Sequence, residues 1–288
     1  MDATQGEMRH VTGEMTAADG LRLARRSWLP AREPVAALAV VHGYGEHSGR
    51  YAELAGVLAV AGYAVHAYDL RGHGRSGGRR GHVGRFSEYL DDTGLFLAAV
   101  RGDEPGRPVV LLGHSLGGLI TASYVQQRPT GDLTGLALSS PFLRLTVPVS
   151  AFKVAAARVL SVVAPTVDVG NPLDAAALSH DQAVVDLYRT DPLNHHDATA
   201  RWGAEVLAAQ RAALAAAPSI SLPLIVQYGG ADAVADPAAG RELFARAASA
   251  DKTVYCYPGY YHEIFNETGR AEVLADLASW LDAHTCEG

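Results

Sequence analysis

The sequence predicts an α/β protein with a mostly parallel central sheet, flanked by helices and interrupted by a helical insertion. Short apolar runs rich in valine and leucine alternate with amphipathic helical stretches. The alternation stops between about Phe142 and Pro218, and polar loops follow several of the apolar runs. Strands that are buried on both faces have nearly continuous apolar sequences, so this pattern is typical of a parallel sheet covered on both sides.

Six apolar runs are predicted to be buried strands. They cover residues 35–41, 63–68, 108–113, 136–140, 224–229 and 253–257. Between the first two runs, an apolar stripe with helical spacing over residues 51–61 predicts a helix, which Gly62 ends. A similar stripe over residues 274–281 predicts that the chain closes on a helix docked against the sheet.

The insertion at residues 142–218 is predicted to be a helical cap, and residues 1–141 and 219–288 to form one core. The insertion consists of alanine-rich helical stretches broken by prolines. An open parallel sheet binds ligands beyond the carboxyl ends of its strands. Helices inserted after one of those ends would therefore cover the binding site.

Composition limits the possible partners and locations. The formal net charge is -7 and the pI is about 5.9. An acidic protein of this kind is not expected to have the basic surface that binds a phosphate backbone, so nucleic acid is not expected as a partner. The first residues are acidic where a signal peptide would be basic, and no apolar run follows them, which predicts a cytoplasmic protein.

An apolar segment of the insertion raises the question of membrane contact. Lys153 and Arg158 interrupt the stretch 145–167, so we do not expect it to span a membrane. Residues 147–163 carry an apolar stripe, which is compatible with peripheral contact of the cap with lipid. Ordinary packing within the cap is the alternative.

The motif GHSLGG at residues 113–118 lies directly between a predicted strand and a helical stretch. A turn this tight requires glycine on both sides of its central residue, and its strain exposes the hydroxyl of Ser115. Ser115 is therefore the predicted nucleophile. His114 is next to Ser115 on a sharp turn and cannot fold back onto it, so we expect His114 to pack beneath the sheet.

A serine hydroxyl is a weak nucleophile at neutral pH and needs a base, which a third group must orient. His262 follows the last predicted strand and is the predicted base. Asp232 follows the strand at 224–229, after two glycines, and is the predicted acid. Asp236 is the alternative acid, but it precedes a proline and has the pattern of a helix N-cap.

Two backbone N–H groups are expected to receive the negative charge of a tetrahedral intermediate. One belongs to Leu116, which follows the nucleophile. The other belongs to Tyr44 in the loop after the first predicted strand, which His42 and Gly43 are expected to shape. The polar residues of the loop 69–74 are interpreted as making structural hydrogen bonds.

Together these motifs resemble the monoacylglycerol lipases, and related lysophospholipases share much of the pattern. The resemblance runs from about Val35 to the last helix and depends most on residues 42–51, 75–78, 113–118, 188–193 and 261–267. It implies the α/β-hydrolase fold and a cytosolic or peripheral enzyme that frees a fatty acid from a monoacylglycerol. An apolar channel beneath the cap would hold the acyl chain. Tyr44 is bulkier than the small or aliphatic residue often found at this position in the family.

Several functions within this fold stay open at this point. A lysophospholipase or general carboxylesterase would use the same triad on another lipid or small ester. A non-catalytic receptor and a cofactor-free haloperoxidase would share the fold but not the reaction. The resemblance implies no cofactor, and no metal site is expected, because His195 and His196 lack a matching ligand pair and are interpreted as solvated.

Glu46 and Arg50 are predicted to bind the substrate's leaving group. They place charge in the loop that carries Tyr44, at the mouth of an otherwise apolar pocket. The hydroxyls of a glycerol moiety would hydrogen-bond with such groups. The alternative is a structural ion pair, because residues four apart can share one helical turn.

Overall fold

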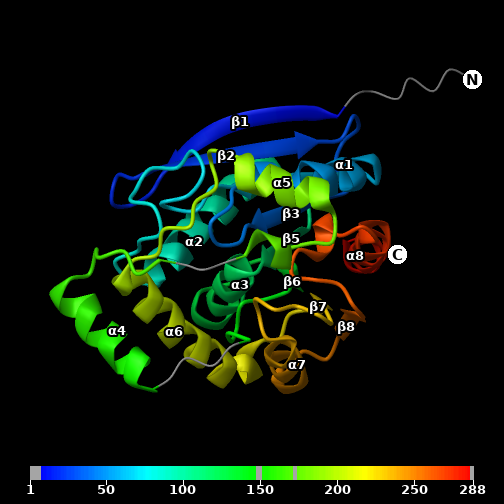
Figure 1. The fold of residues 1–288 in the computed structure, drawn as a ribbon. Helices are drawn as coiled ribbons and strands as arrows, with labels where there is room; N and C mark the ends of the chain where they lie inside the picture. Colours follow the sequence, from blue (N-terminus) through cyan, green and yellow to red (C-terminus); the bar gives the residue numbers. More distant parts are fainter. Residues whose placement is uncertain (1–7, 147–150, 171–173, 286–288) are drawn as a thin grey trace, which may run out of the picture.

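The computed structural model describes residues 8–146, 151–170 and 174–285. Within these residues, eight strands form one sheet in the order β1-β2-β4-β3-β5-β6-β7-β8 (Figure 1). The strands are β1 (Arg9–Thr16), β2 (Arg22–Leu29), β3 (Ala36–Val41), β4 (Tyr63–Tyr68), β5 (Val109–His114), β6 (Leu133–Ser139), β7 (Leu224–Gly229) and β8 (Lys252–Tyr257). The strands from β4 to β8 in this order are parallel, and β1 and β2 are antiparallel to their neighbours.

The six predicted strands are confirmed as β3 to β8, with one correction. The run at residues 253–257 was expected to be buried, which is wrong for most of β8. β8 is an edge strand, and Val254 is exposed. The sequence prediction did not include β1 and β2, because polar residues interrupt both strands and almost all of β1 is exposed.

Helices cover both faces of the sheet. They are α1 (Ala52–Val60), α2 (Ser87–Asp103), α3 (Leu116–Gln127), α4 (Ala151–Val163), α5 (Gln182–Thr190), α6 (Ala200–Ala215), α7 (Pro237–Arg246) and α8 (Arg270–Thr285). Side chains of a strand alternate between faces, so Leu38 and Val40 pack with α1 and α8, whereas Ala37, Ala39 and Val41 join the core under α2, α3 and α7. The helices predicted over residues 51–61 and 274–281 are α1 and α8.

Three of these helices, α4, α5 and α6, lie between β6 and β7, inside the residues predicted to form the cap. α6 packs against α4 and α3, and its apolar face joins the larger core (Figure 1). α5 packs with the short 3-10 helix η2 (Ala175–Ala177) around a small separate cluster that includes Val185 and Tyr188. The division into core and cap stays a prediction.

Candidate active site

Ser115 occupies the sharp turn between β5 and α3. Its backbone lies in a left-handed region, with φ 53° and ψ -117°, a conformation that costs energy in a residue with a side chain. A Cβ atom on Gly113 would lie 2.3 Å from the carbonyl oxygen of Gly117, and one on Gly117 would lie 2.0 Å from the carbonyl oxygen of Val41. The turn therefore requires both glycines of the motif, as the sequence predicted.

Three predicted residues from distant parts of the chain meet in one row of hydrogen bonds. The Nε2 atom of His262 lies 2.8 Å from the Oγ atom of Ser115. On the other side of the same ring, Nδ1 lies 2.7 Å from Oδ2 of Asp232. All three side chains are buried, and they come from the loops after β5, β7 and β8. This geometry allows His262 to take a proton from Ser115 while Asp232 holds the ring.

The backbone after β7 fixes the orientation of Asp232. Its Oδ1 atom accepts hydrogen bonds from the backbone N–H groups of Val234 at 2.8 Å and Ala235 at 2.9 Å. Asp236 is engaged elsewhere: it caps the N-terminus of α7 through the N–H of Ala238 and pairs with Arg144. The structure therefore places Asp232, and not the alternative Asp236, against His262.

The carboxylates around His262 raise the pKa of its ring. Burial by itself lowers the pKa of this histidine, but the charge and hydrogen bond of Asp232, together with Glu263 and Glu46, raise the pKa above its usual value. Raising the pKa strengthens the base and stabilises the imidazolium that forms when the serine proton is taken.

The pKa of the histidine next to the nucleophile is shifted in the opposite direction. Burial and the neighbouring His262 lower the pKa of His114 to about 4, so this ring is neutral. His114 was expected to pack beneath the sheet. Its ring instead lies beside that of His262, with centroids 5.0 Å apart, and its Nδ1 contacts the hydroxyl of Ser139.

The two predicted oxyanion donors lie close to the nucleophile. Leu116 is the first residue of α3, where a backbone N–H has no acceptor within the helix. Tyr44 follows Gly43, whose α-carbon is so close to the turn that an added Cβ would lie 3.2 Å from the Cβ of Ser115. Within the described part of the chain, the N–H of Tyr44 has no hydrogen-bond acceptor. That these two groups bind an oxyanion stays a prediction.

Glu46 and Arg50 form a buried network with a third residue, Glu263. One carboxylate oxygen of Glu46 accepts the N–H of Gly43 at 2.6 Å and the hydroxyl of Tyr51 at 2.9 Å. Its other oxygen accepts Arg50 at 2.8 Å, and the same guanidinium donates to Glu263 at 2.7 Å. Burial alone would raise the pKa of Glu46, but Arg50 and the nearby histidines lower it to about 2. These contacts support the structural alternative for the pair.

Glu263 was not among the predicted site residues, although it directly follows the predicted base in the motif at residues 261–267. Its carboxylate binds Arg50 through both oxygens and thereby joins the loop of His262 to the loop of Tyr44. Glu46, Arg50, His114 and Glu263 also line one small cavity. Adjacency to His262 in the sequence was the signal that could have identified it.

The polar residues of the loop after β4 make structural hydrogen bonds, as expected. Asp69 accepts from the backbone N–H groups of Ser48 at 2.8 Å and Arg75 at 2.7 Å. His42 is part of the same arrangement, because its Nε2 accepts the N–H of Leu70 at 2.9 Å. These contacts shape the loops around the site and leave neither residue free to act as a base.

The interpretation of His195 as a solvated residue is wrong. His196 is exposed, but His195 is buried, and its ring lies beside Tyr44 and His73. The cause is a fold of the chain after α5, which brings the backbone N–H of His195 to 3.0 Å from the carbonyl oxygen of Gly45. Among the described residues, no group of three or more histidine, cysteine or acidic side chains is arranged to hold a metal ion.

The chain is similar to known proteins along most of its length. Residues 32–269 match the family model Hydrolase_4, described as serine aminopeptidase, S33. The chain is 39% identical to the monoacylglycerol lipase of Mycolicibacterium smegmatis over 92% of this chain and 94% of that protein. It is 38% identical to the human monoglyceride lipase, over 93% of this chain and 89% of that protein.

A solved structure shows the same similarity in three dimensions. The monoacylglycerol lipase of Paleococcus ferrophilus superposes with a TM-score of 0.78 at 33% sequence identity and covers 96% of this chain and 99% of its own. The family model spans most of the chain, and the relatives are similar along nearly their whole length. The chain therefore belongs to the Hydrolase_4 family, serine aminopeptidase S33, and is an ester hydrolase of the α/β-hydrolase fold.

Proposed function

We propose that this protein hydrolyses monoacylglycerol to a fatty acid and glycerol through an acyl-enzyme on Ser115. The observation that carries the proposal is the row of hydrogen bonds from Ser115 through His262 to Asp232. The sequence similarity to proteins named monoacylglycerol lipase supports the choice of substrate.

The geometry supports a two-step reaction. His262 takes the proton of Ser115 as the Oγ atom attacks the ester carbonyl, and the N–H groups of Tyr44 and Leu116 bind the resulting oxyanion. His262 then gives its proton to the departing glycerol oxygen. A water molecule, activated by the same ring, releases the fatty acid. Asp232 stabilises the imidazolium in both steps.

A substrate panel tests the proposal. We expect hydrolysis of monoacylglycerols to exceed that of di- and triacylglycerols and of a lysophospholipid with the same acyl chain. A labelled fluorophosphonate should attach to Ser115. Preferred cleavage of the lysophospholipid would identify a lysophospholipase. Absence of both labelling and ester hydrolysis would instead indicate a receptor with the same fold.

We infer that the helical insertion contacts lipid at a membrane surface. Exposed apolar side chains gather along α4 and the segment after it, and Val159, Val162 and Val163 are 63–73% exposed. Leu187 on α5 is exposed as well. Residues 147–150 of the predicted stripe lie outside the described residues. None of the described helices is both long enough and apolar enough to cross a membrane. The cytoplasmic location stays a prediction.

Changing Val159 and Val163 to aspartate should slow hydrolysis of emulsified lipid by about tenfold, because a charge at each position opposes burial in the headgroup region. Hydrolysis of a short soluble ester should stay unchanged. Val60→Asp is the matched control, because Val60 is 91% exposed on α1, which is not part of the insertion. Equal loss on both substrates, or no loss on either, would contradict lipid contact.

Arg50→Met tests the role of the buried network. The guanidinium is occupied by Glu46 and Glu263, and its removal leaves two buried carboxylates without their cation. We expect a lower melting temperature and a similar proportional loss of activity on a monoacylglycerol and on a nitrophenyl ester with the same acyl chain. A loss confined to the monoacylglycerol, without a change in melting temperature, would show that Glu46 and Arg50 bind the leaving group.

A further inference from the structure

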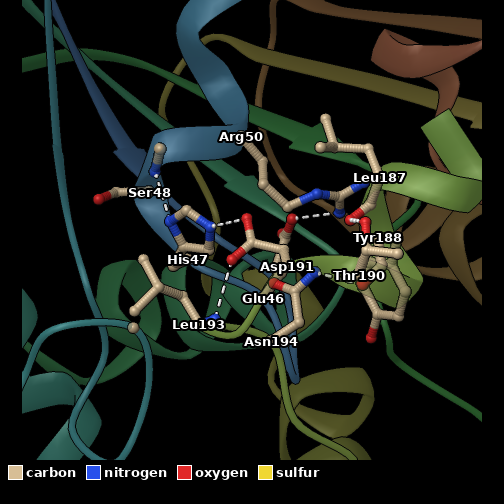
Figure 2. A network of polar contacts seen from close by, with 12 residues as sticks. Glu46, His47, Ser48, Arg50, Leu187, Tyr188, Thr190, Asp191, Leu193 and Asn194 are labelled. Carbon is tan, nitrogen blue, oxygen red and sulfur yellow. Dashed lines mark hydrogen bonds and ion pairs between the residues drawn. The ribbon is translucent and has the colours of Figure 1, made fainter. Parts of the chain in front are cut away.

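The loop that carries Tyr44 is held by the insertion as well as by the core. After α5 the chain returns across this loop, and Figure 2 shows His47 and Asp191 facing each other there. Three contacts join the two segments. They are His47 Nε2 to Asp191 Oδ2 at 3.0 Å, the N–H of His195 to the carbonyl oxygen of Gly45 at 3.0 Å, and the hydroxyl of Tyr44 to the carbonyl oxygen of Asp197. We call these contacts the latch.

The pair of His47 and Asp191 is fixed on both sides. The Nδ1 atom of His47 accepts the N–H of Gly49 at 3.1 Å, so the proton of a neutral ring lies on Nε2 and is donated to Asp191. The other oxygen of Asp191 accepts the N–H of Leu193 at 2.8 Å. Burial alone would raise the pKa of Asp191, but Leu193 and His47 lower it, which keeps the carboxylate charged. Both side chains therefore have a single orientation.

Tyr44 enters the latch with its side chain and the proposed oxyanion hole with its backbone. Its ring packs against Trp202 and His195 of the insertion, with centroids 4.1 Å and 5.4 Å away, and against His73 of the core. Burial raises the pKa of the phenol, so the hydroxyl stays protonated and can donate to Asp197. A change in the position of the insertion would therefore act on the residue whose N–H is the predicted donor.

The contact at Gly45 leaves no room for a side chain between the loop of Tyr44 and the insertion. Gly45 has a φ of 72°, and an added Cβ atom would lie 2.5 Å from the carbonyl oxygen of His195. Only glycine fits both this backbone conformation and this approach. The loop and the insertion therefore touch backbone to backbone one residue after Tyr44.

We propose that the latch positions the oxyanion donor: the side chains of Tyr44, His47 and Asp191 fix the insertion on the loop and thereby aim the N–H of Tyr44 at the reacting carbonyl. This inference rests on the proposed function, and these side chains are positioning residues that act through a backbone group. A donor aimed in advance stabilises the transition state more than the bound ester. Weakening the latch should therefore lower kcat and leave KM nearly unchanged.

Tyr44→Phe and Asp191→Ala test the latch, each by removing one contact. Each variant should lower kcat on a soluble nitrophenyl ester by about tenfold, a fraction of the loss caused by removing an oxyanion donor. Inhibition by an alkyl boronic acid, whose adduct with Ser115 resembles the tetrahedral intermediate, should weaken by a similar factor. His47→Leu should behave like Asp191→Ala. His47→Gln keeps an N–H for Asp191 and should restore most of the activity.

Arg79→Met is the matched control. Arg79 donates to the carbonyl oxygen of Thr166 at 2.8 Å, which also joins the core to the insertion but does not touch the loop of Tyr44. This variant should keep kcat and boronic acid affinity. If Tyr44→Phe and Asp191→Ala also keep both, or if Arg79→Met loses as much as they do, the latch does not position the donor.

Failure of the latch is distinguishable from failure of the proposed function. If the unmodified protein is labelled by a fluorophosphonate and hydrolyses esters while the latch variants keep kcat, only the latch is wrong. If the unmodified protein is neither labelled nor active, the proposed function is wrong. The proposed role of the latch, which rests on that function, is then wrong as well. Tyr44→Phe retains the ring that packs against Trp202, so the test stands even if Asp191→Ala does not fold.

Discussion

Ser115→Ala is expected to lower ester hydrolysis by about five to six orders of magnitude, and His262→Ala by a similar factor. The serine oxygen forms the covalent intermediate, and the ring is the proposed base within 2.8 Å of it. The two losses should not add in the double variant, because either change alone removes the activated nucleophile. The measurement is kcat/KM on a nitrophenyl ester, together with fluorophosphonate labelling.

The fold should survive these substitutions. Alanine at position 115 has the same strained backbone as serine, and the change removes one hydrogen bond at a buried site. Ser123→Ala is a matched control: Ser123 is buried in α3, and its hydroxyl has no hydrogen-bond partner in the part of the chain that the structure describes. Ser123→Ala should keep full activity. If Ser115→Ala kept a tenth of the activity, another residue would be the nucleophile.

The sequence was most informative where chemistry depends on strand ends. Parallel strands bring their carboxyl ends to one edge, so the residues that follow β5, β7 and β8 had to lie near one another. This topology explains why the sequence alone predicts that Ser115, Asp232 and His262 lie together. The glycines of the turn were predictable for a local reason, because any Cβ atom there would collide with the backbone.

Features that depend on long-range packing were missed. β1 lies at the edge of the sheet and pairs with β2, and neither strand contains an apolar run, so their pairing was not visible in the sequence. β8 has the composition of a buried strand but lies at the edge of the sheet. His195 is polar and sits in a loop, yet the return of the chain across Gly45 buries it.

Asp232→Asn is expected to lower kcat by about four orders of magnitude, because it should hold His262 in the wrong tautomer. The N–H groups of Val234 and Ala235 need an acceptor at Oδ1, so the carbonyl oxygen of the new amide should stay there and its NH₂ group should face His262. That NH₂ group donates to Nδ1, which places the ring proton on Nε2, where it points at Ser115 and blocks removal of the serine proton.

Asp236→Asn is the matched control and would also identify a wrong assignment of the acid. Asparagine is a good N-cap, so α7 should keep its cap, and the loss of the pair with Arg144 should lower the melting temperature only slightly. The kcat of Asp236→Asn should stay within about twofold of that of the unmodified protein. Asp236 makes no contact with His262, and solvent screens the charge of this partly exposed side chain. A greater loss of kcat in Asp236→Asn than in Asp232→Asn would mean that the acid reaches His262 from a different loop position during turnover. Parallel measurement of both variants, on one soluble ester and across pH, therefore tests the acid directly.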